Sequence, residues 1–390
     1  MVLRHKGVRG VRVLTACGEI TSARAYFWAA GEGGVCPADA ALGIAQGRVS
    51  PGARQILCRM GMVQNFAQAA EDARRIGNIP LGKERLRQLV EREAHAIAQQ
   101  RDRGQVAAAW SSADAQVSPG GPTRVYAGVD GVMVPTVTQE EKARRRKDHA
   151  VRRQQRAAAG VGNTKPLPPA KAGSDERYKE MKIGVFYDQA KQHKHVFATA
   201  GDHQVLGSLL KAHAALVQFE QAQQSISLTD GAKWIVHQIC LNLLLIKVLL
   251  LDFYHLSEHV HAAARCCLGE TQAARDWAQA RLKEFKEQGV TAALVAIDAL
   301  TRRVRSPAKQ TSLRQLREYV VSRMEMLDYP KALAQGWDIG SGPTEAMCKN
   351  LTLRLKRPGM KWDRDNAAAM MNLVALYESG QADRYWAQAA

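Results

Sequence analysis

Cysteines are few in this 390-residue sequence, and their spacing argues against the usual cysteine-based sites. There are seven of them, an odd number, with one adjacent pair at Cys266 and Cys267 and no C-x-x-C pair. A disulfide framework or a cysteine zinc site needs paired or closely spaced thiols. The composition therefore fits a protein of the reducing cytoplasm, where thiols remain free.

The sequence also lacks a long uninterrupted apolar run. The N-terminal stretch MVLRHKGVRG has no apolar core of the kind that a signal peptide requires. The most apolar segment, residues 235–254, is interrupted by Asn242 and Lys247. We therefore expect a buried helix and then a buried strand in this segment, and no membrane partner.

Acidic residues are scarce relative to basic ones. Lys plus Arg is 55 and Asp plus Glu is 37, which gives a formal net charge of +18. Such an excess favours a polyanionic partner, with nucleic acid the first candidate. The hydrophobic content of 46% is ordinary for a globular protein, and the length suits about two or three domains.

The first hundred residues divide into two parts. Residues 1–52 contain a weakly alternating stretch that predicts a β-ribbon bent at Cys17-Gly18, and residues 53–103 predict amphipathic helices in a helix-turn-helix layout. Basic side chains on the second of those helices would contact DNA, namely Lys83, Arg85 and Arg87. An ordinary helical hairpin with a solvated basic face explains the pattern equally well. Residues 104–122, which end in Pro-Gly-Gly-Pro, read as a linker.

Residues 123–256 predict an α/β core. The order of apolar segments reads β-β-β-α-β-α-β, followed by a helical insertion over 257–335 and by C-terminal helices of the core over 336–390. Hairpin-joined strands followed by strand-helix crossovers make a mixed sheet with helices packed on it.

A basic insertion interrupts this core over residues 139–178. It carries eight cations between Lys142 and Arg156, among them Arg144, Arg145 and Arg146. We expect a mobile loop or a short solvated helix. It would serve as a phosphate-contacting arm or, alternatively, as a merely soluble insertion.

Three acids stand where side chains can converge at one edge of the predicted sheet. Asp130 lies inside an apolar strand, Asp230 ends another strand, and Glu345 lies in the first turn of a helix. Two Mg²⁺ or Mn²⁺ ions would relieve the repulsion among the carboxylates and support in-line phosphoryl transfer. Asp202 and Asp252 also follow predicted strands and are rival ligands.

The helix that carries Glu345 has cations behind it and is expected to run to Pro358. Helical spacing places Lys349, Thr352 and Lys356 on the face of Glu345, and Arg354 nearly opposite. This arrangement predicts a DNA path along the helix past Lys349 and Lys356. The alternative is a solvated basic face with one Glu-Lys pair.

Two other functions compete with phosphoryl transfer. The segment from His255 to His259 matches H-x-x-E-H, in which two histidines and Glu258 would make a zinc protease site. A non-catalytic DNA-binding regulator would use the N-terminal helices and would need none of the three acids.

Four segments resemble the characteristic blocks of bacterial insertion-sequence transposases of the DDE type, close to the ISKra group. They are YAGVDGVMVP, SLTDGAKWI, LLLDFYHLSEHV and GWDIGSGPTEAMCKNLTLRLKRPGMKW, in that order, and the likeness extends from Val125 to the C-terminus. The resemblance implies an RNase H-like core in which Asp130, Asp230 and Glu345 hold two metal ions, with 257–335 as an insertion domain. It also implies binding of terminal inverted repeats and target DNA, a homo-oligomer assembled on DNA, and strand cleavage and transfer. Asp252 and His255 would then support the site from outside the metal-ligand set.

The N-terminal segment departs from that family. Similar proteins often carry a zinc ribbon where this chain keeps only Cys36, so we expect no metal there. Packing of Tyr26, Phe27 and Trp28 would hold the ribbon instead.

Overall fold

The computed structural model describes residues 3–31, 33–45, 47–161, 169 and 171–389. Part of the predicted basic insertion, residues 162–168 and 170, lies outside the described residues. The chain forms two compact units. The first comprises residues 1–107, 132–181 and 350–390, and the second comprises residues 108–131 and 182–349.

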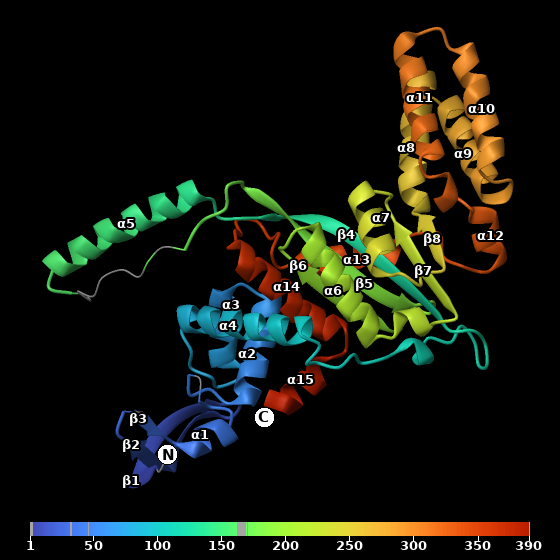
Figure 1. Ribbon diagram of the computed structural model, residues 1–390. Helices are drawn as coiled ribbons and strands as arrows, with labels where there is room; N and C mark the ends of the chain where they lie inside the picture. Colours follow the sequence, from blue (N-terminus) through green and yellow to red (C-terminus); the bar gives the residue numbers. More distant parts are fainter. Residues whose placement is uncertain (1–2, 32, 46, 162–168, 170, 390) are drawn as a thin grey trace. The chain divides into compact units, whose positions relative to one another are not determined.

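A five-stranded mixed sheet organises the second unit. Its strand order is β6-β5-β4-β7-β8 (Figure 1). Strands β5 and β6 pair antiparallel, whereas β4 with β7 and β7 with β8 pair parallel. The strands are β4 (Arg124–Pro135), β5 (Tyr178–Asp188), β6 (Lys194–Thr199), β7 (Gln224–Thr229) and β8 (Val248–Leu251). The protein is thus a mixed α/β protein, with its strands and helices in the order that the sequence predicted.

Helices α6 (His203–Leu216) and α7 (Lys233–Asn242) cover one face of this sheet. Side chains alternate along a strand, so every second residue of β4 points to the same face. On this face β4 contributes Val125, Ala127 and Val129 to an apolar core with the two helices. The short helix η2 (Phe219–Gln221) follows α6 and buries Phe219 in the same core, and η1 (Ser112–Asp114) precedes β4.

The intervening residues of β4 face helix α13 (Gly342–Thr352). A Cβ added to Gly128 would lie 1.9 Å from the hydroxyl of Thr344, so the missing side chain is what lets α13 lie directly on the strand. Tyr126, two residues earlier, stacks on Tyr187 of β5 at 5.1 Å between ring centroids. The site described below is built on this face.

Helices fill the segment between β8 and α13. Figure 1 shows α8, α9, α10 and α11 standing side by side as a bundle next to β8. Their interior is an apolar core separate from that of α6 and α7. The elements are α8 (Phe253–Leu268), α9 (Gln272–Glu287), α10 (Val290–Arg303), α11 (Pro307–Val321), η3 (Met324–Met326) and α12 (Tyr329–Ala334). Helix α8 begins four residues before the predicted start of the insertion at 257, because Asp252 caps it.

In the first unit, β1 (Arg4–Thr15) and β2 (Gly18–Ala29) form an antiparallel ribbon, which β3 (Gly33–Val35) extends. Helix α1 (Pro37–Ala41) follows the ribbon. The ring of Tyr26 lies under the guanidinium of Arg9, and Phe27 contacts His5. Trp28 is 40% exposed, so the expected packing of all three aromatic residues is wrong for Trp28.

A helical core makes up most of the rest of this unit. It comprises α2 (Pro51–Val63), α3 (Phe66–Arg75), α4 (Lys83–Asp102), α14 (Arg364–Glu378) and α15 (Ala382–Ala389). Arg101 at the end of α4 is buried and donates hydrogen bonds to Asn372 on α14 and to Ser379 and Gln381 after it. The N-terminal helices and the C-terminal helices therefore share one interior.

The basic insertion begins with a long helix. Helix α5 (Gln139–Ala158) has 20 residues, starts from a Thr138 cap and buries none of its side chains. The expected loop or short helix is thus a five-turn solvated helix over the part that the structure describes. Among the described helices, none combines the length and the apolar character needed to cross a bilayer.

Candidate active site

Three aspartates lie level with one another on three neighbouring strands. In the register of the sheet Gly128 of β4 pairs with Leu228 of β7, and Thr229 of β7 pairs with Leu251 of β8. Asp130 comes two residues after Gly128 and Asp230 comes two residues after Leu228, so these two aspartates are level. Asp230 comes one residue after Thr229 and Asp252 comes one residue after Leu251, so these two are level as well. Neighbouring strands are roughly 4.8 Å apart, so the sheet brings the backbone of these three aspartates to one edge.

Asp130 is half-buried on the α13 face of β4. One carboxylate oxygen accepts a hydrogen bond from the amide of Gly131 at 2.6 Å, and the other lies 3.4 Å from the thiol of Cys348 on α13. Burial raises the pKa of Asp130, and the negative charge of Asp230 adds to the effect. A bound cation at this position would offset both contributions.

Asp230 lies in the turn between β7 and α7. Its carboxylate accepts a hydrogen bond from the amide of Ala232 at 2.8 Å. Gly231 makes the turn with φ +77, a conformation that residues with a side chain rarely adopt. From the bundle, the guanidinium of Arg323 donates to the Gly231 carbonyl at 3.0 Å, and the Tyr319 hydroxyl lies 3.4 Å from the Asp230 carbonyl. The bundle therefore fixes the backbone that carries Asp230.

Asp252 is fully buried and caps α8. One carboxylate oxygen accepts from the amides of Tyr254 and His255, and the other accepts from the amide of Ser341 just before α13. The imidazole Nδ1 of His255 lies 3.4 Å from this carboxylate. Burial opposes the charge of Asp252, but hydrogen bonds from His255 and Ser341 outweigh it and lower the pKa of Asp252 to about 2. The same pairing raises the pKa of His255 to about 9.

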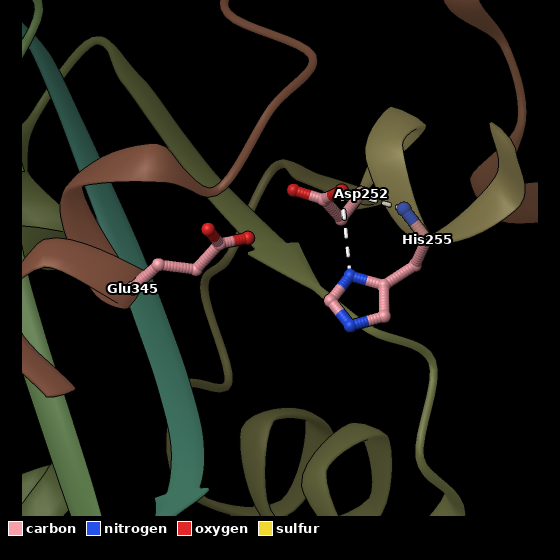
Figure 2. Close-up of side chains that lie close together, drawn as sticks. All are labelled: Asp252, His255 and Glu345. Atoms are coloured by element: carbon pink, nitrogen blue, oxygen red, sulfur yellow. Dashed lines mark hydrogen bonds and ion pairs between the residues drawn. The ribbon is translucent and has the colours of Figure 1, made fainter. Parts of the chain in front are cut away.

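Glu345 points from the first turns of α13 toward this pair, as Figure 2 shows. One potential ligand atom from each of Asp252, His255 and Glu345 lies within 4.8 Å of the other two. Glu345 is exposed, and its carboxylate has no hydrogen-bond or ion-pair partner among the residues that the structure describes. Its carboxylate is therefore available for a ligand.

Two of the three predicted ligands lie outside the group whose ligand atoms are within 4.8 Å of one another, which consists of Asp252, His255 and Glu345. Asp130 and Asp230 are linked to it through charge, since Asp230 raises the pKa of both Asp130 and His255. Carboxylate oxygens are the ligands that Mg²⁺ and Mn²⁺ prefer. The donor set therefore fits hard divalent cations. Asp252 and Asp130 are each contacted at both carboxylate oxygens and Asp230 accepts a hydrogen bond from Ala232, whereas the Glu345 carboxylate accepts none from the described residues. Glu345 is therefore the acid most open to a cation.

The H-x-x-E-H segment forms no such group. His255 turns to Asp252, whereas the ring of His259 stacks on Tyr319 at 3.8 Å between centroids. Glu258 is exposed. The group of possible ligands around His255 includes neither Glu258 nor His259, so the geometry does not favour the zinc protease.

Asp202 has another role. Its carboxylate caps α6 by accepting hydrogen bonds from the amides of Gln204 and Val205, both at 2.9 Å. Helix capping therefore explains why an acid stands after this strand, and no metal-ligand role is needed for Asp202.

The expected cationic face of the Glu345 helix is only partly present. Lys349 lies on α13, exposed and one turn beyond Glu345. The helix ends at Thr352, however, and the backbone amides of Leu355 and Lys356 both return to the Thr352 carbonyl. Lys356 therefore lies outside the helix, and the predicted alignment of Lys356 with Glu345 is wrong. Thr352, expected on the same face, is buried.

Arg354 is buried where the chain leaves the helix. Its guanidinium lies 5.1 Å from the ring centroids of both Phe66 and Trp362 in the first unit, and the side chain is 4% exposed. The sequence predicted it on the helix, nearly opposite Glu345, but it lies beyond the end of α13. The local sequence does not reveal these tertiary contacts, which the chain makes directly after the end of α13.

The remaining predicted DNA contacts lie in the first unit. Lys83 and Arg85 are exposed on α4, but Arg87 is bound by Glu84 and Glu91 on the same helix. Arg144, Arg145 and Arg146 are exposed on α5, with Arg145 paired to Glu141. Of these cations, Arg87 is thus the least suited to a phosphate contact.

Two contacts of the site were not predicted from the sequence. The buried thiol of Cys348 touches Asp130, and the amide of Ser341 holds Asp252. Cys348 lies three residues after Glu345, a spacing that places both on one helix face, and this was the available clue.

Comparison with known proteins gives one finding. A family model described as "Uncharacterised protein family (UPF0236)" matches residues 217–388. No curated protein matches the chain. The matched segment runs from the end of α6 to α15 and holds Asp230, Asp252, His255 and Glu345, but not Asp130. Over that segment the chain is similar to a family whose members are uncharacterised.

Proposed function

We propose that this protein is a DDE-type transposase, which binds the ends of an insertion sequence and catalyses metal-dependent DNA strand cleavage and strand transfer. The observation that carries the proposal is the placement of Asp130 and Asp230 at one level of two neighbouring parallel strands and of Glu345 on α13, the helix that contacts Asp130 through Cys348. Carboxylates at one edge of the sheet, of which that of Glu345 has no partner among the described residues, suit divalent cations.

The sheet supports the proposal at the level of fold. Strand β4, the first of the core along the chain, lies in the middle of the sheet. Strands β5 and β6 lie on one side of it, and β7 and β8 lie on the other. An RNase H-like core, the fold implied by the resemblance, would have this strand order. Asp130 lies on the middle strand β4, Asp230 follows its parallel neighbour β7, and Glu345 lies on α13.

The residues of the site would divide the work. Asp130, Asp230 and Glu345 would hold Mg²⁺ or Mn²⁺, which would activate the attacking oxygen and stabilise the leaving oxygen. Asp252 would position the start of α13 through Ser341, and with it Glu345. His255 would be held by Asp252 beside the carboxylates.

Charge supports DNA as the substrate. The net charge of +18 favours a polyanion, and α5 presents eight cations between Lys142 and Arg156 on a helix that buries none of its side chains. An assembly of several copies on two DNA ends belongs to the same proposal.

Cleavage of DNA that flanks the gene tests the proposal. The purified full chain is incubated with duplexes made from that flanking DNA and Mg²⁺ or Mn²⁺. We expect nicking at defined positions that EDTA abolishes, and a loss of at least about a hundredfold in Asp230→Asn and Glu345→Gln.

Asp202→Asn is the matched control. Asn also caps helices well, so α6 should remain folded and cleavage should be unchanged. DNA binding should survive in all three variants, because none removes a cation. Cleavage at the wild-type rate by Glu345→Gln would reject the proposed metal site. Binding without any metal-dependent cleavage would instead favour a DNA-binding regulator.

A further inference from the structure

A cavity of about 610 Å³ lies beside Glu345 in the second unit. Its walls come from the starts of α8 and α13, the segment before α13, the β5–β6 turn and α9. Phe253 and Tyr254 directly follow Asp252. Pro343 comes two residues before Glu345, and Ala346 comes directly after it. The elements that carry two of the acids therefore also line this cavity.

One wall is aromatic. Tyr254 is 66% exposed, although it stands beside the buried Phe253. A Cβ added to Gly340 would lie 2.9 Å from the ring of Tyr254, so the glycine leaves the space in which the ring lies. An exposed aromatic ring in a cavity offers a face on which a planar base can stack.

The rim is cationic. Lys191, Lys194 and Lys286 line the cavity together with a single acid, Asp338. The ammonium of Lys191 lies 3.0 Å from the Asp338 carboxylate, and that of Lys286 lies 4.2 Å from the centroid of the Phe253 ring. Two of the three lysines thus have no carboxylate among the residues lining the cavity. A ligand with a flat apolar part and a phosphate matches these walls.

We propose that the cavity binds one unpaired nucleotide of the DNA strand whose phosphate lies at Glu345, with the base on Tyr254 and a phosphate at the lysines. This rests on the proposed function for the identity of the strand. Both faces of a base are covered in a duplex, so only an unpaired or extruded base exposes a face to Tyr254. The site would therefore act on strand ends that are locally opened.

Photocrosslinking in EDTA tests the proposal without any need for chemistry at the metal site. The full chain is mixed with a short oligothymidylate that carries 5-iodouracil, irradiated, digested and mapped by mass spectrometry. We expect crosslinks at Tyr254. Affinity should fall at least about fivefold in Tyr254→Ala and stay near wild type in Tyr254→Phe, which keeps the ring.

Two lysines on α9 make a matched pair. Lys286 lines the cavity, whereas Lys283 is on the same helix, outside the cavity, with its side chain 71% exposed. Lys286→Gln should lower the slope of log affinity against log salt by about 0.7, and Lys283→Gln should leave it unchanged. Equal slopes in the two variants would contradict the placement of phosphate in the cavity.

Other outcomes separate this proposal from the proposed function. Wild-type affinity in Tyr254→Ala, or crosslinks only at residues outside the cavity, would overturn it even if metal-dependent cleavage is found. Competition by free thymidine monophosphate as strong as that by the oligonucleotide would make this a site for free nucleotides. Crosslinks at Tyr254 without metal-dependent cleavage would reject the transposase but retain the strand site.

Discussion

At Gly128 the lack of a side chain determines where a helix lies. Thr344 occupies the space that a Cβ would fill, and Glu345 is the next residue on α13. Asp130, Asp230 and Glu345 could be picked from the sequence, because Asp-Gly after an apolar run and an acid at a helix start are visible patterns. The contact between Gly128 and Thr344 joins residues 216 positions apart and has no local signature.

Gly128→Ala is expected to push α13 away from β4. A Cβ at 1.9 Å from Thr344 must displace the helix, and such overpacking costs about 1–3 kcal/mol. Urea unfolding should show this loss, and cleavage should fall with it because Glu345 moves. Gly10→Ala, where a Cβ would meet nothing within 4 Å, should change neither property.

The Asp252–His255 pair predicts a pH dependence of stability. The folded pKa of His255 is raised to about 9, above its ordinary value of 6.5. The pairing therefore stabilises the fold fully below about pH 6.5, and that stabilisation is lost as the pH rises through 9. Urea unfolding in EDTA across this range should show the decline.

His255→Gln is the comparison for that decline. This variant has no imidazole to titrate, so its free energy of unfolding should be flatter between pH 6.5 and 9 than that of the wild type. The exposed His203, replaced by Gln, is the control and should leave the wild-type decline intact. Identical curves for His255→Gln and the wild type would show that the pair contributes no proton linkage.

At the scale of elements, the spacing of hydrophobic residues predicts the strands and the long helices, but it does not predict where they end. The predicted order of the core is present because each strand is a short apolar run and each helix has an apolar face. Directly after the early end of α13, Arg354 contacts Phe66 and Trp362. Leu353 and Leu355 continue an apolar pattern, so nothing nearby in the sequence signals the break.

The early end of α13 separates the two lysines that were predicted to share one helix face. Lys349 follows Glu345 by roughly 6 Å along the helix axis, whereas Lys356 lies beyond the helix. We expect Lys349→Gln to reduce cleavage of short duplexes and to make it more sensitive to salt, with a smaller effect from Lys356→Gln. Equal losses would show that helix position does not matter. Arg354→Gln is unsuitable as a control, because it removes a buried side chain.

Helix α5 predicts a salt effect on DNA binding. Its exposed cations lie on a helix with no buried residue, so replacing Arg144 and Arg146 by Gln should leave the fold intact. Where one of these side chains binds a phosphate, its replacement should lower the slope of log affinity against log salt by about 0.9 on duplex DNA. An unchanged slope would reduce α5 to a solvated helix that does not touch DNA.

At the scale of the whole molecule, the order of segments along the chain differs from their grouping in space. The predicted boundaries at 103, 122 and 256 follow the sequence linearly, whereas the first unit collects three separate stretches of chain. Composition and turn residues show where a segment ends, but not which distant segment it joins. The interior shared by α4 and α14 follows only from interactions such as those of Arg101.

Arg101→Met should destabilise the first unit strongly. The guanidinium is buried and donates to Asn372, Ser379 and Gln381, and its loss leaves these acceptors without their donor. We expect a loss on the order of 3 kcal/mol in urea unfolding. Arg103→Met, two residues on and exposed, should have little effect. A near-zero change in Arg101→Met would mean that the network contributes nothing net.

The hydrogen bond between Arg101 and Gln381 can form only late in the synthesis of the chain. The partners are 280 residues apart, so at about 5–20 residues per second a ribosome needs roughly 14 to 56 s to make the second after the first. During that interval α4 has been synthesised, but α14 and α15 have not. The apolar face of α4 that packs against the C-terminal helices therefore remains exposed. The second unit has all its residues by 349, and therefore can close before the first. A chain stalled or cut before α14 would expose that face permanently and become a substrate for chaperones and proteases.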